Sequence, residues 1–366
     1  MQIVAQGAQD KYLTVDPEIT FFKSMHRRHT NFAVESIEQT FNGHVTSGGK
    51  VSATISRNGD LVSRMWLEFD TDTPGFGADA TTAYDMIDNV SLEIGGTRVD
   101  RHYGEWMEIS DDLRCEPGKR DGLNTCVKTA GAKKVRVPLS FWFCKDAGQA
   151  LPLIALQYHE VKLNVEFKTL PSDAKVSLWV DYIYLDTAER QRFARSAHEY
   201  LIEQVQTTGQ ETLGNGSNKI RLNFNHPVKE LVWTATMDKY ASGAWSSGVP
   251  ALKSAKLQLN GHDRFAERDA TYFKEVQQFQ HHTGAANAYV YSFALEPEKL
   301  QPSGTCNFSR IDNASLQLEA ENTANGDTSA NPPPEATTKN GKAEVYAVNY
   351  NVLRIKNGMG GLAYSN

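Results

Sequence analysis

The 366-residue sequence lacks the features that membrane-spanning, secreted and nucleic-acid-coating proteins need. No apolar run approaches the roughly 20 residues of a membrane-spanning helix, and the N-terminal MQIVAQGAQDKY turns polar too early for a secretory signal. Lys and Arg number 38 against 44 Asp and Glu, so the net charge of −6 argues against coating nucleic acid. We therefore expect no cleaved signal, no membrane span and no direct nucleic-acid partner.

Cysteine is scarce and follows no ligand pattern. Cys115, Cys126, Cys144 and Cys306 include no Cys-x-x-Cys pair and no metal-ligand spacing. A disulfide between Cys115 and Cys126 stays open, but reduced thiols in a cytosolic setting are the default expectation.

Catalytic motifs are missing as well. The sequence contains no Gly-x-Ser-x-Gly elbow, no Walker-type phosphate loop and no Asp-x-Asp-x-Asp-Gly calcium loop. A cupin, the enzyme-bearing jelly roll, would need a His-x-His pair followed by Glu, which is also missing. We therefore predict that the protein is not an enzyme, with no catalytic, cofactor-binding or metal-binding residues and no cofactor.

A few clusters of ionisable residues are candidates for catalytic, metal-binding or nucleic-acid-binding sites. Four carboxylates lie within one short stretch, the best case for acid–base catalysis or a cation site: Glu105, Glu108, Asp111 and Asp112. Other candidates for metal or nucleic-acid contacts are His159-Glu160, His281-His282 and the basic segment Met25–His29. We interpret the carboxylates as a solvated loop, the histidine pairs as loop and strand-end residues, and the basic segment as a surface that contacts a neighbouring chain.

What the sequence does contain is one pattern that occurs twice. Val180–Asp186 (VDYIYLD) returns 168 residues later as Val348–Arg354 (VNYNVLR), and Ile37–Gln39 returns 165 residues later as Ile202–Gln204. Further matches follow in the same order: Lys50-Val51 with Lys219-Ile220, Met65-Trp66 with Val232-Trp233, Ser91–Gly96 with Lys256–Gly261, Arg98-Val99 with Arg264-Phe265, Leu139–Phe141 with Tyr291–Phe293, and Val161–Glu166 with Ala314–Glu319. Two copies of one domain are the simplest explanation.

Each copy is predicted to be a set of short strands separated by turns. In the first copy the strands are Val34–Phe41, Lys50–Ser56, Leu61–Phe69, Met86–Ile94, Thr97–Arg101, Val135–Phe143, Val161–Phe167 and Val176–Leu185. The polar stretch Tyr103–Lys134 is expected to be a long loop without an amphipathic helix. About eight strands and about 165 residues per copy favour a jelly roll over an immunoglobulin-like sandwich.

The predicted fold class is therefore all-β, with two tandem eight-stranded antiparallel jelly-roll sandwiches. Residues 1–25 are an N-terminal arm, 26–186 the first jelly roll, 187–198 a connector and 199–366 the second jelly roll. The connector is expected to form one or two helical turns capped by Asp186 or Thr187. Two long polar loops, Thr236–Pro250 and Glu321–Lys342, should be exposed.

Blocks spread over the chain resemble a known family. Among them are GAQDKYLTVDPEITFFKSMHRRHTNFAVESIEQ, LPLIALQYHEVKL, WVDYIYLDTAERQRFA, QPSGTCNFSRIDNASL and NYNVLRIKNGMGGLAYSN. They run from Gly7 to Asn366 and resemble the major capsid protein of nucleocytoplasmic large DNA viruses, with the closest likeness to those of large algal viruses. Brief loops such as Thr169–Lys175 make this chain shorter than many relatives.

The resemblance implies a double jelly roll whose chains form homotrimers, pseudo-hexagonal capsomers that tile an icosahedral shell. It also implies assembly in the host cytoplasm, contacts with neighbouring capsomers and minor capsid proteins, and an arm on the inner side facing the virion's internal membrane. Relatives carry glycans on outward loop asparagines outside sequons, which makes Asn322 and Asn325 candidates by location. The three Asn-x-Ser/Thr sequons mean little without a secretory route: Asn215, Asn307 and Asn313.

Two functions from other classes are the alternatives to a capsid protein. A tandem jelly-roll carbohydrate-binding module would need exposed aromatic residues at one loop end, where Trp245 stands alone. A glycan-processing enzyme would rest only on the four clustered carboxylates, since a pair at a fixed separation is required.

Overall fold

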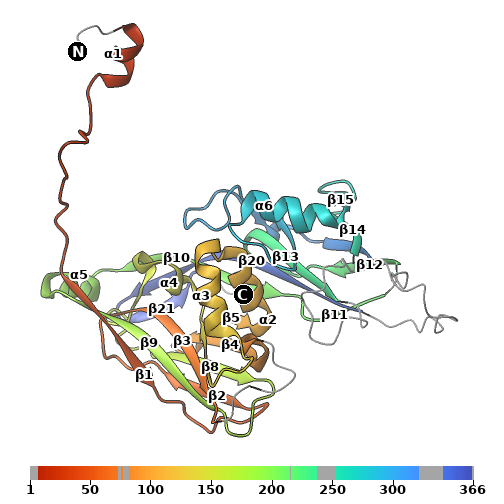
Figure 1. The fold of residues 1–366 in the computed structure, drawn as a ribbon, viewed down its shortest axis with the longest axis horizontal. Helices are drawn as coiled ribbons and strands as arrows, with labels where there is room; N and C mark the ends of the chain where they lie inside the picture. Colours follow the sequence, from red (N-terminus) through yellow and green to blue (C-terminus); the bar gives the residue numbers. More distant parts are fainter. Residues whose placement is uncertain are drawn as a thin grey trace.

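The computed structural model describes residues 7–72, 76, 82–214, 216–236, 252–320 and 341–364. Nearly all of both predicted long loops falls outside these residues, as do Asn215, Trp245, Asn322 and Asn325. The described part consists of two antiparallel sandwiches that stand side by side, with an N-terminal arm that extends away from them (Figure 1).

The first sandwich pairs a sheet of order β1-β9-β3-β6 with a sheet of order β2-β8-β4-β5. Its strands are β1 (Phe32–Gln39), β2 (Lys50–Thr54), β3 (Leu61–Asp70), β4 (Ile87–Ile94), β5 (Thr97–Tyr103), β6 (Lys134–Pro138), the short β7 (Leu151–Pro152), β8 (Val161–Phe167) and β9 (Lys175–Leu185). Every strand predicted for this copy is present within a few residues, except that the sixth ends early. After Pro138 the chain leaves the sheet and turns into the short helix α4 (Trp142–Lys145), and Phe141, Trp142 and Phe143 are all buried there.

The second sandwich repeats this plan with the orders β10-β20-β13-β17 and β12-β19-β14-β15. Its strands are β10 (His198–Thr207), β11 (Glu211–Leu213), β12 (Gly216–Arg221), β13 (Pro227–Thr236), β14 (Leu252–Leu259), β15 (His262–Asp263), β16 (Arg268–Asp269), β17 (Tyr289–Ser292), β18 (Cys306–Asn307), β19 (Ala314–Ala320), β20 (Gly341–Lys356) and β21 (Met359–Leu362). The two tandem jelly rolls predicted from the sequence are confirmed.

The two sandwiches also share their irregularities. The pairing shifts by one residue between Val62 and Arg64 in β3, and again between Val228 and Glu230 in β13. The β4–β5 turn has positive φ at Gly95-Gly96 (60° and 81°), and the β14–β15 turn has it at Asn260-Gly261 (50° and 80°). Because two positive φ values in succession are costly for residues other than Gly and Asn, these turn positions are kept in both copies.

One sequence match is wrong by a single residue. Trp66 pairs with Pro138 and Trp179, whereas the corresponding pairs in the second sandwich join Val232 to Val290 and Tyr346. Trp66 therefore corresponds to Val232, not to Trp233, which is fully buried in the second core. A slip of one residue moves a side chain to the opposite face of a sheet.

The first strands are also offset from the sequence match. Glu38 opposes Trp179, and Thr207 opposes the corresponding Tyr346. Ser36 in β1 thus corresponds to Val205 in β10, four residues away from the partner that the Ile-Glu-Gln repeat suggests. These pairings match each outward residue of the sheet β1-β9-β3-β6 to its equivalent in the sheet β10-β20-β13-β17.

The stretch Tyr103–Lys134, expected to be a loop, contains two helices instead, α2 (Gly104–Arg114) and α3 (Pro117–Val127). Only Trp106, Ile109 and Leu113 mark the apolar stripe of α2, and the acidic residues between them hide the helical pattern in the sequence. The connector helix α5 (Thr187–Arg195) is confirmed, with the Asp186 carboxylate accepting a hydrogen bond from the Thr187 N–H.

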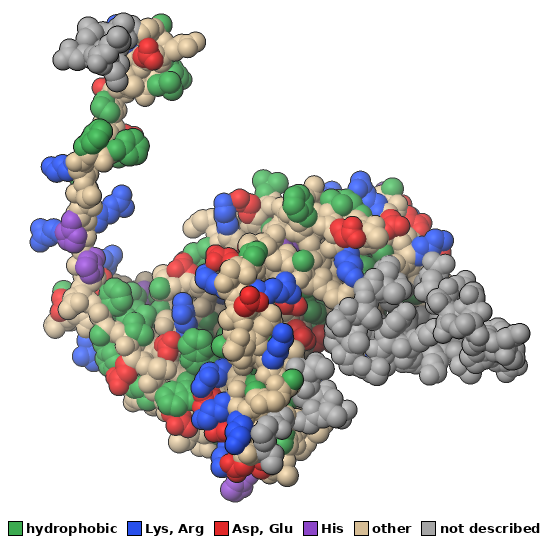
Figure 2. Space-filling model, viewed as in Figure 1, with side chains coloured by type: hydrophobic (Ala, Val, Ile, Leu, Met, Phe, Trp, Pro, Cys, Tyr) green, Lys and Arg blue, Asp and Glu red, His purple; other side chains and the backbone are tan. Residues whose placement is uncertain are grey.

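The described part of the N-terminal arm starts with the short helix α1 (Ala8–Thr14) and then runs extended to β1. Its apolar side chains are exposed, Phe21 to 90% and Phe22 to 99%. Figure 2 shows them standing clear of the body. Exposed apolar side chains of this size are typical of a surface that binds a partner. That the arm lies against another surface stays a prediction.

Each sandwich has its own core, but the first core also takes residues from the second sandwich. Ile202 of β10 and Leu353 and Ile355 of β20 are buried among the side chains of the first sandwich. The two sandwiches therefore share a buried boundary that a linker alone would not provide.

None of the described helices is long and apolar enough to cross a membrane.

Gly104 anchors the start of α2 and offers a test of that anchoring. A Cβ atom there would lie 2.3 Å from the Ile87 carbonyl oxygen and 2.4 Å from that of Tyr84, so the backbone would have to move. We expect Gly104→Ala to lower the free energy of unfolding by about 2 kcal/mol. Gly122→Ala in α3, where a Cβ meets nothing within 4 Å, is the control and should raise it by about 0.5–1 kcal/mol. Urea unfolding followed by circular dichroism measures both, and equal stabilities would contradict the anchoring.

Candidate functional site

Helix α2 leaves the first sandwich and packs on the outer face of the second. Its Trp106, Ile109 and Leu113 form one buried cluster with residues from β13, β17 and β20 and from the loop before β17: Val232, Ala286, Ala288, Val290, Tyr346 and Val348. The rings of Trp106 and Tyr346 lie 5.2 Å apart. Each buried side chain of this size contributes about 2 kcal/mol. This contact is the centre of what we call the joint between the sandwiches.

The four carboxylates expected in a solvated loop lie on α2, and three of them are largely buried, Glu105 against the second sandwich and Glu108 and Asp111 against the first. Burial raises the pKa of Glu105 to about 7, and repulsion from Glu344 adds to the rise, although the Thr234 hydroxyl donates to Glu105 at 3.0 Å. Burial also raises the pKa of Glu108 to about 7, with repulsion from Asp85 and Asp112 next in size. The solvated-loop interpretation is therefore wrong.

Asp111 is the most enclosed of the four. Burial raises its pKa to about 6, against the opposing effect of hydrogen bonds donated by Tyr84 and by Ser140. The carboxylates thus face partners in the two sandwiches, Glu105 across the joint and Glu108 and Asp111 within the first sandwich. Within the described residues, no three His, Cys, Asp or Glu side chains are grouped closely enough to hold a metal ion.

A buried ionic network continues from the end of α2. Arg114 lies 3.3 Å from Glu230 and 4.0 Å from Glu203, and Lys145 of α4 lies 2.6 Å from Glu203. Lys229 of β13 also pairs with Glu203 and donates to the Pro297 carbonyl at 2.7 Å. Arg114 and Lys145 belong to the first sandwich and both glutamates to the second, so the network crosses the joint.

His282 completes the network, directly after helix α6 (Gln277–His281). It is fully buried, with Nε2 3.2 Å from Glu230 and Nδ1 3.1 Å from Glu298. These two carboxylates raise its pKa to about 9 although burial acts in the opposite direction. The Glu230 pKa falls to about 2 because of His282, Lys229 and Arg114, which outweigh burial. The histidine expected at a loop is thus a charged structural residue.

Further contacts close the joint on either side of α2. The Asp100 carboxylate in β5 accepts a hydrogen bond from the Val205 N–H at 3.1 Å. The Gly284 N–H donates to the Leu113 carbonyl at 2.7 Å, and near the C-terminus the Tyr158 N–H donates to Gly358 at 2.9 Å. The joint therefore spans several elements of both sandwiches.

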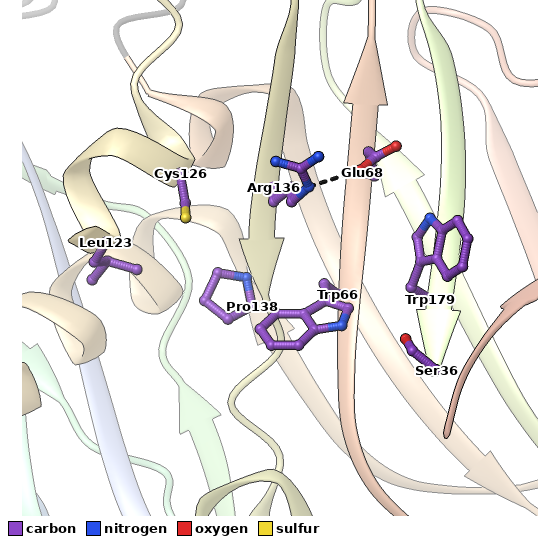
Figure 3. Close-up of a pocket in the computed structure, with 8 residues that line it drawn as sticks. All are labelled: Ser36, Trp66, Glu68, Leu123, Cys126, Arg136, Pro138 and Trp179. Atoms are coloured by element: carbon purple, nitrogen blue, oxygen red, sulfur yellow. Dashed lines mark hydrogen bonds and ion pairs between the residues drawn. The ribbon is translucent and has the colours of Figure 1, made fainter. Parts of the chain in front are cut away.

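The outer sheet of the first sandwich carries an open apolar groove, which sequence reasoning missed. The groove has a volume of about 430 Å³ and is lined by Ser36, Trp66, Glu68, Leu123, Cys126, Arg136, Pro138 and Trp179. Figure 3 shows the two tryptophans and Pro138 on the sheet opposite Leu123 and Cys126 of α3, with the Glu68–Arg136 ion pair beside them. The sequence contains a signal for this groove. Trp66 and Trp179 lie at outward positions of their strands, and exposed apolar side chains of this size indicate a binding surface.

The remaining sequence candidates lie outside the ionic network, although His159 contacts the second sandwich beside the Tyr158–Gly358 bond. All four cysteines are free thiols, so Cys115 and Cys126 are not paired here. Asn307 lies in β18 with its side chain accepting a hydrogen bond from the Ser309 N–H, and Asn313 is exposed just before β19. His159 precedes β8 and its Nδ1 lies 2.9 Å from the Gly360 carbonyl oxygen. The basic segment Met25–His29 lies in the exposed arm.

Comparisons with known proteins agree over the whole chain. The protein-family model described as the major capsid protein N-terminus matches residues 20–186. The family model of the large eukaryotic DNA virus major capsid protein matches residues 189–361. The major capsid protein of Pyramimonas orientalis virus is 47% identical over 416 aligned positions, which cover 100% of this chain and 99% of the relative. This chain belongs to the major capsid protein family of large eukaryotic DNA viruses.

Other members of the capsid family support the same assignment. The major capsid protein of Paramecium bursaria Chlorella virus 1 is 45% identical over 442 positions, covering 100% of this chain and 99% of the relative. A chain of the quasi-atomic PBCV-1 virus capsid superposes with a TM-score of 0.81 at 42% identity, covering 95% of this chain and 100% of that one. The alignments to the Pyramimonas orientalis virus and Chlorella virus proteins span 416 and 442 positions and cover almost all of each relative, so this 366-residue capsid protein is the shorter one, as its brief loops predicted. It is a structural component of the virion capsid and not an enzyme.

Removing a charge from the joint should cost more than removing one from the surface. We expect Arg114→Leu to lower the free energy of unfolding by about 3 kcal/mol, because Glu230 then lacks one of its buried partners. Arg354→Leu, which breaks an exposed pair with Glu199 at 2.9 Å, should cost at most about 1 kcal/mol. Urea unfolding of the two variants compares the effects, and similar losses would show that the network does not hold the joint.

The joint should also weaken as the pH rises. The pKa values of Glu108, Glu105 and Asp111 are raised on folding, so their contribution is present below about pH 4.5 and is lost as the pH rises through about 7. The contribution of His282 is likewise lost as the pH rises through about 9. We expect Glu108→Gln to stabilise the protein at pH 8 by about 2 kcal/mol and to flatten the dependence of the melting temperature between pH 5 and 8. The exposed Glu160→Gln is the matched control, and a Glu108→Gln curve parallel to wild type would contradict the expectation.

Proposed function

We propose that this capsid protein acts as a homotrimer, a pseudo-hexagonal capsomer that tiles an icosahedral shell. The observation that carries the proposal is the joint, which holds two sandwiches of one topology side by side as a single block. Three such blocks around an axis offer six similar corners, so a ring of three chains suits a six-coordinated lattice. Contacts within the ring would be heterologous, with one sandwich of each chain facing the other sandwich of the next.

The division of the chain follows from the same proposal. Residues 1–25 are the arm, 26–186 and 199–366 the two jelly rolls, and 187–198 the connector. The helix α5 from Thr187 to Arg195 and the strand that starts at His198 support the connector, whereas the first strand starts at Phe32 and the extended arm reaches up to it. The arm would lie on the inner side of the shell, where minor capsid proteins and the internal membrane would be its partners.

Assembly would take place in the host cytoplasm, and no direct nucleic-acid contact is needed. The net charge of −6 agrees with a shell that does not itself coat a genome. Covalent glycans would be carried by outer loops, with Asn322 and Asn325 as candidates by location. No cofactor enters the proposed function.

Molar mass is the direct test of the trimer. The purified chain should elute at three times 40.7 kDa at high concentration and form hexagonal arrays in electron micrographs. A chain that stays at 40.7 kDa at high concentration and binds a glycan array would instead support a tandem jelly-roll carbohydrate-binding module.

Deleting residues 1–25 should separate folding from assembly. The described part of the arm, residues 7–25, contributes no side chain to either core, so we expect the truncated chain to form folded trimers with an unchanged circular dichroism spectrum. Shell assembly, or docking of inner partners, should be lost because Phe21, Phe22 and their neighbours are gone. Loss of β structure in the truncated chain would refute this division of labour.

A further inference from the structure

The groove on the first sandwich occupies the same place as the face that α2 covers on the second. The strand pairings align Ser36 with Val205, Trp66 with Val232, Pro138 with Val290, and Trp179 with Tyr346. The four second-sandwich residues all belong to or pack against the α2 cluster. One face is therefore covered within the chain, while its equivalent is an open apolar groove.

The second sandwich also has a helical segment at the position of α2. In the first sandwich, α2 lies between β5 and β6; in the second, η4 (Tyr272–Val276) and α6 lie between β16 and β17. Phe273 fixes this segment, because it is fully buried with its ring 5.2 Å from that of Trp233. The segment is thus a rigid part of the second sandwich.

The outer side of this helical segment is apolar and unpartnered in the single chain. Val276 is 40% exposed and Phe279 88% exposed, and they are three residues apart like Trp106 and Ile109 of α2. Figure 2 shows hydrophobic side chains on the surface where Figure 1 places α6. Side chains three apart lie on one face of a helix, so both can enter one groove.

We propose that Phe279 and Val276 of one copy insert into the Trp66–Trp179 groove of the next copy, repeating between chains the contact that α2 makes within the chain. The inference rests on the proposed trimer and names its contact. Because helix and groove lie on different sandwiches, the contact is head-to-tail, and it closes after three chains if each sandwich is turned by a sixth of a full turn from the one before it. The groove volume of about 430 Å³ accommodates an aromatic side chain.

A cysteine placed on the helix tests the contact directly, since Cys126 already lines the groove. Phe279→Cys is made in a Cys115→Ser chain, because Cys115 lines the same pocket as Phe279. It should give disulfide-linked dimers and trimers on oxidation, detected on a non-reducing gel and reversed by reductant. The double variant Phe279→Cys/Cys126→Ser and the exposed Met359→Cys should give none. Monomers alone from Phe279→Cys, in a protein that is trimeric by mass, would overturn the contact while leaving the proposed function intact.

Mixing two damaged copies tests the direction of the contact. Phe279→Asp removes the helix side and Trp179→Glu the groove side, and each variant alone should be monomeric with a wild-type circular dichroism spectrum. The mixture retains one intact helix and one intact groove, so it should form a species of twice 40.7 kDa and not three times. If Phe279→Asp stays trimeric, the proposal fails. If only deletion of residues 1–25 dissolves the trimer, the groove holds the arm and the proposal also fails. A monomeric wild-type chain would overturn the trimer itself.

Discussion

The structure depends on the burial of one outer sheet face by a helix from the neighbouring sandwich. A jelly roll buries one face of each sheet in its own core, so an apolar outer face needs a cover from elsewhere. Here α2 supplies it, and Trp106, Ile109 and Leu113 bring the two sandwiches into one block. The relative position of the two sandwiches does not depend on the connector α5 alone. Ile202, Leu353 and Ile355 of the second sandwich are also buried in the first core.

The ionic network around this contact favours a defined orientation more than it adds stability. Buried ion pairs often contribute little net stability, since desolvation offsets their attraction. Arg114 and Lys145 nevertheless have partners only when the second sandwich is in place, so a displaced arrangement leaves charges unpaired. The raised pKa values of Glu105 and Glu108 are the cost of placing carboxylates in the same boundary. A subunit that must present its sides at fixed angles benefits from this arrangement.

The sequence predicted the strands well because period-two alternation and turn glycines are local signals. The same signals revealed the duplication and the Asp186 cap. It failed at α2, where only Trp106, Ile109 and Leu113 mark the stripe and the docking surface lies more than 100 residues away in the chain. It also matched the outward Trp66 with the inward Trp233, because both tryptophans follow an apolar residue and a slip of one residue reverses the face of a strand. Burial of Glu105 and His282 follows from those tertiary contacts and has no local signal.

The divergence between the two equivalent faces fits their different histories in assembly. The face covered by α2 is buried as soon as the chain folds, with Val232, Val290 and Val348 at its apolar centre and the buried Glu230 and Thr234 beside them. The first sandwich instead carries Trp66 and Trp179 beside the Glu68–Arg136 ion pair, whose nitrogen and oxygen lie 2.7 Å apart. Charged residues at the rim keep such a surface soluble until a partner arrives, and tryptophans supply large contact area when it does. Duplication therefore gave two copies of one docking face, and the substitutions since then distinguish the one used in folding from the one suited to association.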